Sequence, residues 1–217
     1  MAAQTQFLHS QSQFRAGVPR RRRYNGGVKR IGLFGGSFNP VHLAHLLIAR
    51  AALEELALDR LFFIPAAQSP FKPDQTVVSG AQRARLLRLA LAGWTRCEVE
   101  TLELDRGGVS YTIDTVRAYA VRFPDAELFW LIGADHLALL PSWREAGELA
   151  RLATFVVAAR PGEAFAPPAG FRVKRLTGSP TAISASEMRA RVRAGQPLEP
   201  WMPAPVAEAI RNSGLYL

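Results

Sequence analysis

Two histidines lie three residues apart just after a pair of glycines, where an apolar run gives way to a helical pattern. Residues 31–45 read Ile-Gly-Leu-Phe-Gly-Gly-Ser-Phe-Asn-Pro-Val-His-Leu-Ala-His. A strand, a Gly-rich turn and a helix N-terminus together favour an anion, because backbone N–H groups and the helix dipole point positive charge at the turn. We therefore predict a phosphate site here, with His42 and His45 on the helix face that meets the phosphate.

The residues around the turn narrow the kind of site. Gly35 and Gly36 are expected to adopt backbone angles closed to other residues and to let a ligand approach the main chain. No lysine follows as in a P-loop, and the glycine spacing does not fit a dinucleotide fingerprint. A zinc site is disfavoured, because no glutamate lies between the histidines and no cysteine cluster supplies further ligands. No metal bound directly by protein side chains is predicted.

A second candidate phosphate segment reads Ile-Ser-Ala-Ser-Glu-Met-Arg over residues 183–189. Ser184 and Glu187 fit a capping box, which predicts a helix start whatever else the segment does. Arg189 lies one turn into that helix, where its guanidinium could make bidentate, permanently charged contacts to phosphate.

Apolar runs alternate with helical patterns along the chain, which predicts an α/β fold: a single-domain, Rossmann-like, doubly wound parallel sheet with C-terminal helices. Ligands of such sheets bind beyond the carboxyl ends of the strands, at the switch in strand order. The loops 35–39, 65–72 and 133–135 all follow expected strands and should meet there. The expected strands are 28–33, 61–65, 97–104, 127–132, 154–159 and 171–176, and the expected helices are 41–57, 80–93, 112–123, 142–152, 184–194 and 203–212.

Composition limits the class of protein. The chain has 217 residues, 48% of them hydrophobic, which suits one domain with a sizeable core. Its single cysteine, Cys97, excludes an internal disulfide, and no apolar run approaches the roughly 18 residues of a membrane span. A reducing cytoplasm is the expected compartment, without a membrane contact.

The net charge of +9 is concentrated at the N-terminus. Residues 1–30 hold seven basic and no acidic residues, which leaves 20 basic and 18 acidic residues elsewhere. We expect 1–29 to be a basic, disordered tail, or the result of a start codon assigned too far upstream, ahead of a domain over 30–217. A transit peptide and a nucleic-acid or membrane-surface contact remain alternatives for the tail.

Several of these segments resemble known motifs. Residues 35–45 resemble the Gly-Gly-Ser/Thr-Phe-Asp/Asn-Pro-x-His-x-Gly-His signature of the nucleotidyltransferase superfamily, and residues 30–217 as a whole resemble bacterial nicotinate-nucleotide adenylyltransferases. Ala44 replaces the usual glycine, which would add a methyl group near the nucleotide. Phe71 replaces a histidine that usually precedes Lys72. Segment 183–189 is similar to the motif whose serine, helix N-terminus and arginine hold the triphosphate in that family.

The resemblance implies roles residue by residue. The implied catalytic residues are His42, His45 and Arg189. The implied ATP-binding residues are Gly35, Gly36, Ser37, Phe38, Lys72, Gly133, Asp135, Ile183, Ser184 and Arg189. The implied residues for the second substrate are Ser37, Thr112, Trp143, Arg144 and Arg160. Within that set, Trp143 would stack on a pyridine ring and Arg144 would lie beside its carboxylate.

The reaction implied by the resemblance is transfer of AMP from ATP, with Mg²⁺ bound with the ATP, to nicotinate mononucleotide. Nicotinamide mononucleotide or pantetheine phosphate remain alternative acceptors. A nucleic-acid-binding protein using the tail and the helix of Arg83, Arg85 and Arg88 is the alternative from another class. It is disfavoured because the charge is mostly confined to the tail and no nucleic-acid-binding motif is present. A homo-oligomer is compatible with the sequence.

Overall fold

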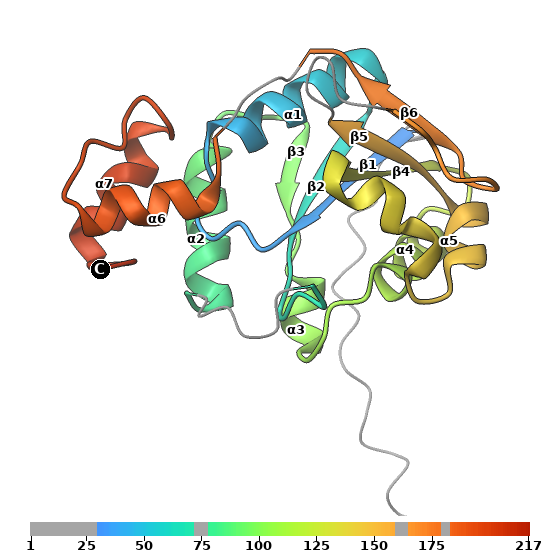
Figure 1. The fold of residues 1–217 in the computed structure, drawn as a ribbon, viewed down its shortest axis with the longest axis horizontal. Helices are drawn as coiled ribbons and strands as arrows, with labels where there is room; N and C mark the ends of the chain where they lie inside the picture. Colours follow the sequence, from blue (N-terminus) through green and yellow to red (C-terminus); the bar gives the residue numbers. More distant parts are fainter. Residues whose placement is uncertain (1–29, 72–77, 159–164, 179–182) are drawn as a thin grey trace, which may run out of the picture.

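A single parallel sheet organises the chain. The structure is a computed structural model that describes residues 30–71, 78–158, 165–178 and 183–217. Its six strands lie in the order β3-β2-β1-β4-β5-β6, each parallel to its neighbours (Figure 1). Their bounds are β1 Arg30–Gly36, β2 Arg60–Pro65, β3 Cys97–Val99, β4 Glu127–Gly133, β5 Ala153–Ala158 and β6 Val173–Leu176. The order reverses between β1 and β4, so the expected Rossmann-like fold is confirmed and its switch point lies at that pair.

Helices cover both faces of the sheet. They are α1 Leu43–Glu55, α2 Gly80–Ala90, α3 Leu102–Arg106, α4 Thr112–Arg122, the 3₁₀ helix η1 Ala134–Ser142, α5 Ala146–Leu152, α6 Ala185–Arg193 and α7 Ala204–Ser213. Buried residues of α1, α2, α6 and α7 form one core cluster, and those of α4, α5 and η1 form the other. Successive strand residues face opposite sides, so Phe34 enters the first cluster and Leu33 the second.

Two expected elements are wrong in part. The expected strand 97–104 ends at Val99, because Leu102 to Arg106 turn as a short helix that places Glu103 against Thr115. The apolar spacing of that segment matches a strand only loosely. The expected helix 142–152 begins at Ala146 instead, since Trp143 is extended and Glu145 takes a left-handed conformation with φ of 54°.

The glycine pair also differs from expectation. Gly35 and Gly36 are the last residues of β1, and neither has a positive φ. Gly35 is required for another reason: a Cβ there would lie 2.6 Å from Cζ2 of Trp130 on the neighbouring strand. The left-handed residue of the turn is Phe38, with φ of 45°. The geometry of the turn after β1 therefore depends on a strained non-glycine residue.

The structure bears on two features noted from the composition, the lack of a long apolar run and the single cysteine. Among residues 30–71, 78–158, 165–178 and 183–217, no helix is long and apolar enough to cross a bilayer. Cys97 is a buried free thiol. The expected tail over 1–29 lies outside the described residues.

Candidate functional site

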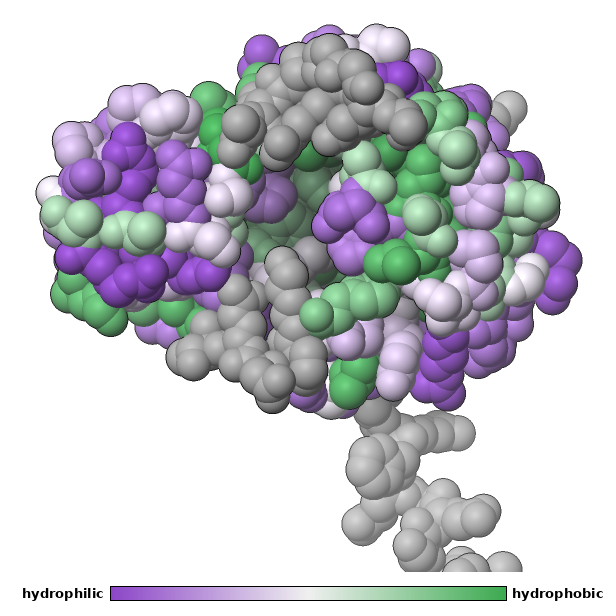
Figure 2. Space-filling view, in the orientation of Figure 1, coloured by the Kyte–Doolittle hydropathy of each residue, from purple (hydrophilic) through white to green (hydrophobic). Residues whose placement is uncertain are grey.

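A cavity of about 360 Å³ opens beyond the carboxyl ends of the central strands, and Figure 2 shows the hollow in this face of the molecule. It brings together segments that are far apart in the sequence: the β1–α1 turn, the starts of α4 and α6, and the end of β4 with η1. The predicted site residues that line it are Gly35, Gly36, Ser37, Phe38, His45, Thr112, Gly133, Asp135, Trp143, Ser184 and Arg189. The structure therefore brings these predicted residues together at one cavity.

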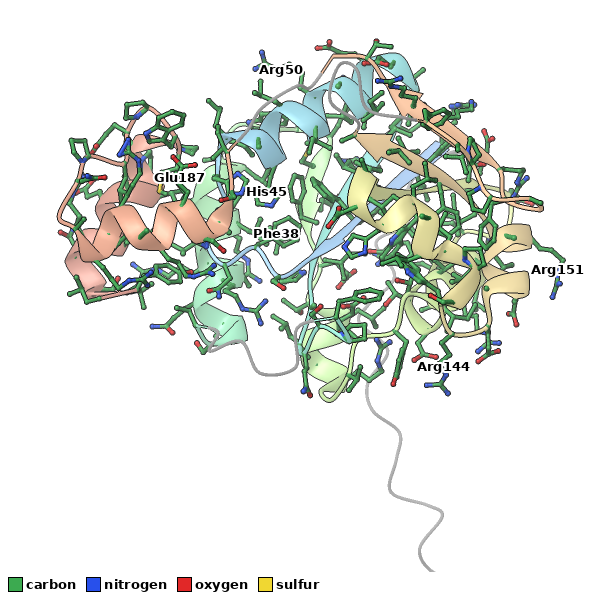
Figure 3. The ribbon with its side chains drawn as sticks, in the orientation of Figure 1. Phe38, His45, Arg50, Arg144, Arg151 and Glu187 are labelled. Carbon is green, nitrogen blue, oxygen red and sulfur yellow. The ribbon has the colours of Figure 1, made fainter. Side chains whose placement is uncertain are left out.

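The two histidines are stacked at the start of α1. Their ring centroids lie 3.8 Å apart, and His45 also contacts Phe38, with centroids 5.0 Å apart (Figure 3). The backbone N–H of His42 donates to Nδ1 of His45 over 3.2 Å. Burial lowers the pKa of His42 to about 4 and, with the charge of His42, lowers the pKa of His45 well below 6.5. His45 is therefore neutral at pH 7, and since Nδ1 accepts, its proton is assigned to Nε2.

The lowered pKa of His42 predicts a pH-dependent stability. The pKa of His42 is about 6.5 in the unfolded chain and about 4 in the folded chain. Between these pH values the unfolded chain binds more protons, so the folded state loses stability as the pH falls. For His42 alone the expected loss in unfolding free energy is about 2 kcal/mol between pH 7 and pH 5. Denaturant unfolding at both pH values measures it. His42→Asn keeps a good N-cap residue but cannot titrate, so it should show a loss smaller by that amount; an identical loss would contradict the assignment.

The start of α6 supplies an arginine to the β1–α1 turn. Ser184 Oγ accepts from the backbone N–H of Glu187 over 3.1 Å, which confirms the predicted cap. Arg189 donates from Nη1 to the carbonyl oxygen of Asn39 over 2.9 Å and from Nη2 to Ser186 Oγ over 3.0 Å. A guanidinium has five N–H groups, so within the described structure Arg189 keeps donors for a ligand in the cavity.

Aromatic rings form one wall of the cavity. The ring centroid of Phe71 lies 5.6 Å from Trp143 and 4.9 Å from His136, and His136 lies 6.0 Å from Trp143. All three rings line the cavity, and Phe71 is 46% exposed. His136, from η1, brings an imidazole to the same wall. A flat ring could stack here.

Three predicted site residues that the structure describes do not line this cavity. His42 is buried behind His45, and Ile183 packs half-buried on the core. Arg144 lines a smaller adjoining cavity of about 110 Å³, points outward in Figure 3, and lies 4.7 Å from the ring centroid of Tyr111. Lys72 and Arg160 lie outside the described residues.

Ala44, where the resemblance leads us to expect glycine, does not place its methyl group in the cavity. Its side chain is 7% exposed and is not among the residues that line the cavity. The expectation that its methyl group would crowd the nucleotide side therefore finds no support in the cavity as it stands.

Other cavity residues were missed from the sequence. Trp130 on β4 lines the cavity. The sequence feature that could have indicated it is Gly35, the glycine beside it on the neighbouring strand β1. Glu103 is 3% exposed and accepts from Thr115 Oγ1 over 2.6 Å, and burial raises its pKa. The sequence predicts a strand over residues 97–104, and a strand there gives no reason to expect Glu103 in the cavity. Ser110 accepts from the backbone N–H of Ala67 over 2.9 Å and so ties the two loops together.

The site offers few ligands for a metal. Among the described residues, no group of three or more His, Cys, Asp or Glu side chains could hold an ion. Of the carboxylates lining the cavity, Glu103 is buried and hydrogen-bonded, whereas Asp135 is 81% exposed in its side chain. This donor set suits a cation that arrives on a phosphate group and keeps most of its water ligands.

Comparisons with known proteins agree with this geometry. The family model described as cytidylyltransferase-like matches residues 33–191. A probable nicotinate-nucleotide adenylyltransferase of Bordetella petrii is 46% identical over 198 residues, spanning 87% of this chain and 100% of that protein. One of Opitutus terrae is 43% identical over 190 residues, spanning 86% of this chain and 97% of that protein. Among solved structures, the nicotinic acid mononucleotide adenylyltransferase of Plasmodium falciparum, complexed with NaAD, has a TM-score of 0.74 at 16% identity, covering 87% of this chain and 97% of that one.

Proposed function

Because this chain belongs to the nicotinate-nucleotide adenylyltransferase family, we propose that its cavity transfers AMP from ATP to the phosphate of nicotinate mononucleotide. The products are nicotinate adenine dinucleotide and pyrophosphate, which places the protein in NAD biosynthesis. The observation that carries the proposal is that a histidine, an arginine and a helix N-terminus converge on one cavity that also has an aromatic wall. Those parts suit a triphosphate and a pyridine side by side.

The reaction needs little covalent chemistry from the protein. A phosphate oxygen of the mononucleotide attacks the α-phosphorus of ATP in line, the bond to the β-phosphate oxygen breaks, and pyrophosphate leaves. The protein holds the reactants together and stabilises charge that spreads over the phosphate oxygens. His45 suits the second task, because its neutral Nε2–H is a donor and not a nucleophile.

The triphosphate would lie between the β1–α1 turn and α6. Arg189 and the N-terminus of α6, capped by Ser184, supply a fixed positive charge and backbone donors for the β- and γ-phosphates. Lys72 is proposed as a further phosphate contact and Asp135 as a ribose contact. His42 acts through His45, by fixing its tautomer.

We propose that Mg²⁺ enters with ATP. Bound to the triphosphate, the ion would neutralise its charge, and Asp135 is the exposed cavity carboxylate that could hold one of its water ligands. The chain's own contribution is to orient the phosphates with Arg189 and to supply the N–H of His45. We also propose the cytoplasm, where Cys97 stays reduced, as the compartment.

The mononucleotide would lie against the aromatic wall. Trp143 offers its face to the pyridine, Thr112 stands at the start of α4 beside it, and Arg144 flanks the adjoining cavity on the outer side. Arg160 remains a proposed contact. The N-terminus of α4 and the guanidinium of Arg144 are both positive and lie next to this wall. They favour the negatively charged carboxylate of a pyridine over a neutral amide.

Trp143→Ala is expected to raise the KM for nicotinate mononucleotide about tenfold, on the scale of 1–1.5 kcal/mol for a lost ring-stacking contact, while the KM for ATP changes less than about twofold. Steady-state kinetics with each substrate varied in turn measures both constants. The aromatic wall contains a control, because Phe155→Leu alters the ring that packs behind Trp143 without removing the stacking face. Equal increases in both KM values for Trp143→Ala would remove the stacking role.

The proposed reaction is tested by offering MgATP with nicotinate mononucleotide, nicotinamide mononucleotide or phosphopantetheine in separate reactions and identifying products by chromatography and mass. We expect nicotinate adenine dinucleotide to dominate. Turnover of one of the other acceptors alone would overturn the proposed specificity and keep the chemistry, and no turnover with any acceptor would overturn the function.

The nucleic-acid alternative loses part of its basis. It requires the basic face of α2, yet Arg83 on that helix is only 2% exposed and is hydrogen-bonded to backbone carbonyl groups. Of the three arginines of α2, Arg85 and Arg88 are the exposed ones.

A further inference from the structure

Arg83 is a buried cation that the proposed chemistry does not use. Its side chain extends from α2, and its three nitrogens donate to carbonyl groups of three separate segments. Nη1 reaches Ser37 O over 2.8 Å, Nη2 reaches Ala66 O over 2.7 Å, and Nε reaches Val78 O over 2.9 Å. One guanidinium therefore joins the loop after β1 to the loop after β2 and to the residues just before α2.

The bond to Ser37 controls which way the next peptide N–H points. In a trans peptide unit the carbonyl and the following N–H point in opposite directions. The carbonyl of Ser37 points to Arg83, which is not among the residues that line the cavity, so the N–H of Phe38 points away from Arg83, and Ser37 and Phe38 are themselves lining residues. Backbone N–H groups aimed at a cavity are what a phosphate group binds.

Phe38 needs this support because its backbone is strained. With φ of 45° it occupies a region that costs an L-residue free energy and persists only where its surroundings hold it. The carbonyl before it, on Ser37, is held by Arg83, and the carbonyl after it, on Asn39, is held by Arg189. The two arginines, from α2 and α6, thus bracket the strained residue.

The positive charge of Arg83 lies close behind the wall of the cavity. Among the described residues no carboxylate forms an ion pair with it, and burial lowers its pKa, partly offset by the nearby Tyr216 hydroxyl. A guanidinium one peptide unit behind the cavity wall favours an anion on the other side of that wall, because fields are weakly screened where water is excluded.

We propose that Arg83 is a positioning residue for the triphosphate of ATP: it fixes the Ser37–Phe38 peptide unit in the orientation that binds phosphate. It touches neither substrate and acts through the main chain of the turn. This inference rests on the proposed function, and it concerns ATP and not the mononucleotide, whose proposed aromatic wall is formed by other residues: Phe71, His136 and Trp143.

The test compares three variants. Arg83→Met removes the charge and the donors but keeps a long apolar stem, Arg83→Lys keeps the charge but cannot reach three carbonyl groups at once, and Arg85→Met changes an exposed arginine on the same helix. We expect Arg83→Met to raise the KM for ATP at least about tenfold with the KM for nicotinate mononucleotide changed less than about twofold. Arg83→Lys should fall between it and wild type, and Arg85→Met should match wild type.

Calorimetric titration with inorganic tripolyphosphate separates this inference from the proposed reaction. Loss of Arg83 should weaken tripolyphosphate binding by a similar factor, whatever the acceptor turns out to be. Circular dichroism reports whether Arg83→Met folds. If it does not fold, the KM for ATP and the tripolyphosphate affinity of Arg83→Lys test the inference instead. Unchanged KM for ATP and tripolyphosphate affinity in a folded variant, or equal increases in both KM values, would overturn the assignment. If the wild-type protein shows no turnover but Arg83→Met still binds tripolyphosphate more weakly than wild type, the proposed reaction alone would be contradicted.

Discussion

Replacing His45 by alanine is expected to lower kcat/KM by a factor of about 30 to 10³, on the scale of 2–4 kcal/mol for one lost donor to a developing charge. The physical reason is the fixed tautomer: Nδ1 accepts from the backbone of His42, so Nε2–H can donate to an α-phosphate oxygen or to the leaving pyrophosphate. The fold should survive, because the ring stands at the edge of the cavity. Steady-state kinetics and thermal unfolding of the variant measure the two effects separately.

His45→Asn is the matched control. It removes the ring but keeps an amide N–H near the same place, so part of the lost rate should return. The burial of His45 adds a pH criterion: since its pKa lies well below 6.5, the wild-type rate should not fall between pH 6 and pH 8 through loss of a histidine proton. An unchanged kcat/KM in His45→Ala would remove the residue from the mechanism.

Arg189→Ala should lower kcat/KM for ATP by a factor of about 10², on the scale of 1.5–3 kcal/mol for hydrogen bonds to a charged group. Two losses combine: the cation facing the β- and γ-phosphates, and the bond that holds the carbonyl of Asn39 in the turn. The KM for ATP should therefore rise more than the KM for the mononucleotide.

Two variants of the same helix sharpen this prediction. Arg189→Lys keeps the charge and loses the planar fork, so it should recover only part of the affinity. Arg193→Ala, at an exposed position one turn further on, should behave as wild type. If Arg193→Ala were as damaging as Arg189→Ala, the general charge of α6 and not the geometry of Arg189 would be responsible.

The strong local patterns of the sequence predicted most of the fold and most of the cavity. The run ending at Gly36, the cap at Ser184 and the apolar strand ending at Gly133 each mark the end or start of an element, and all three meet where the strand order switches. This works because a parallel sheet gathers the ends of its strands at one edge, so local boundaries become spatial neighbours.

What the sequence could not give depends on contacts between distant segments. Arg83 reads as one of several basic residues on a helix, and only the fold shows it buried against Ser37 and Ala66. Gly35 reads as a source of flexibility, yet its role is to leave room for Trp130. The strain at Phe38 is likewise invisible in the sequence, because no rule of local propensity places a left-handed conformation on phenylalanine.

In the proposed reaction the phosphate of nicotinate mononucleotide attacks the α-phosphorus directly, with His45 as a donor and without an adenylylated enzyme as intermediate. The most direct test uses ATP made chiral at the α-phosphorus by a single sulfur substitution, followed by analysis of the configuration of the dinucleotide formed. A single in-line displacement predicts inversion at phosphorus. Retention would require two displacements, which would contradict the claim and make His45 the first nucleophile to examine.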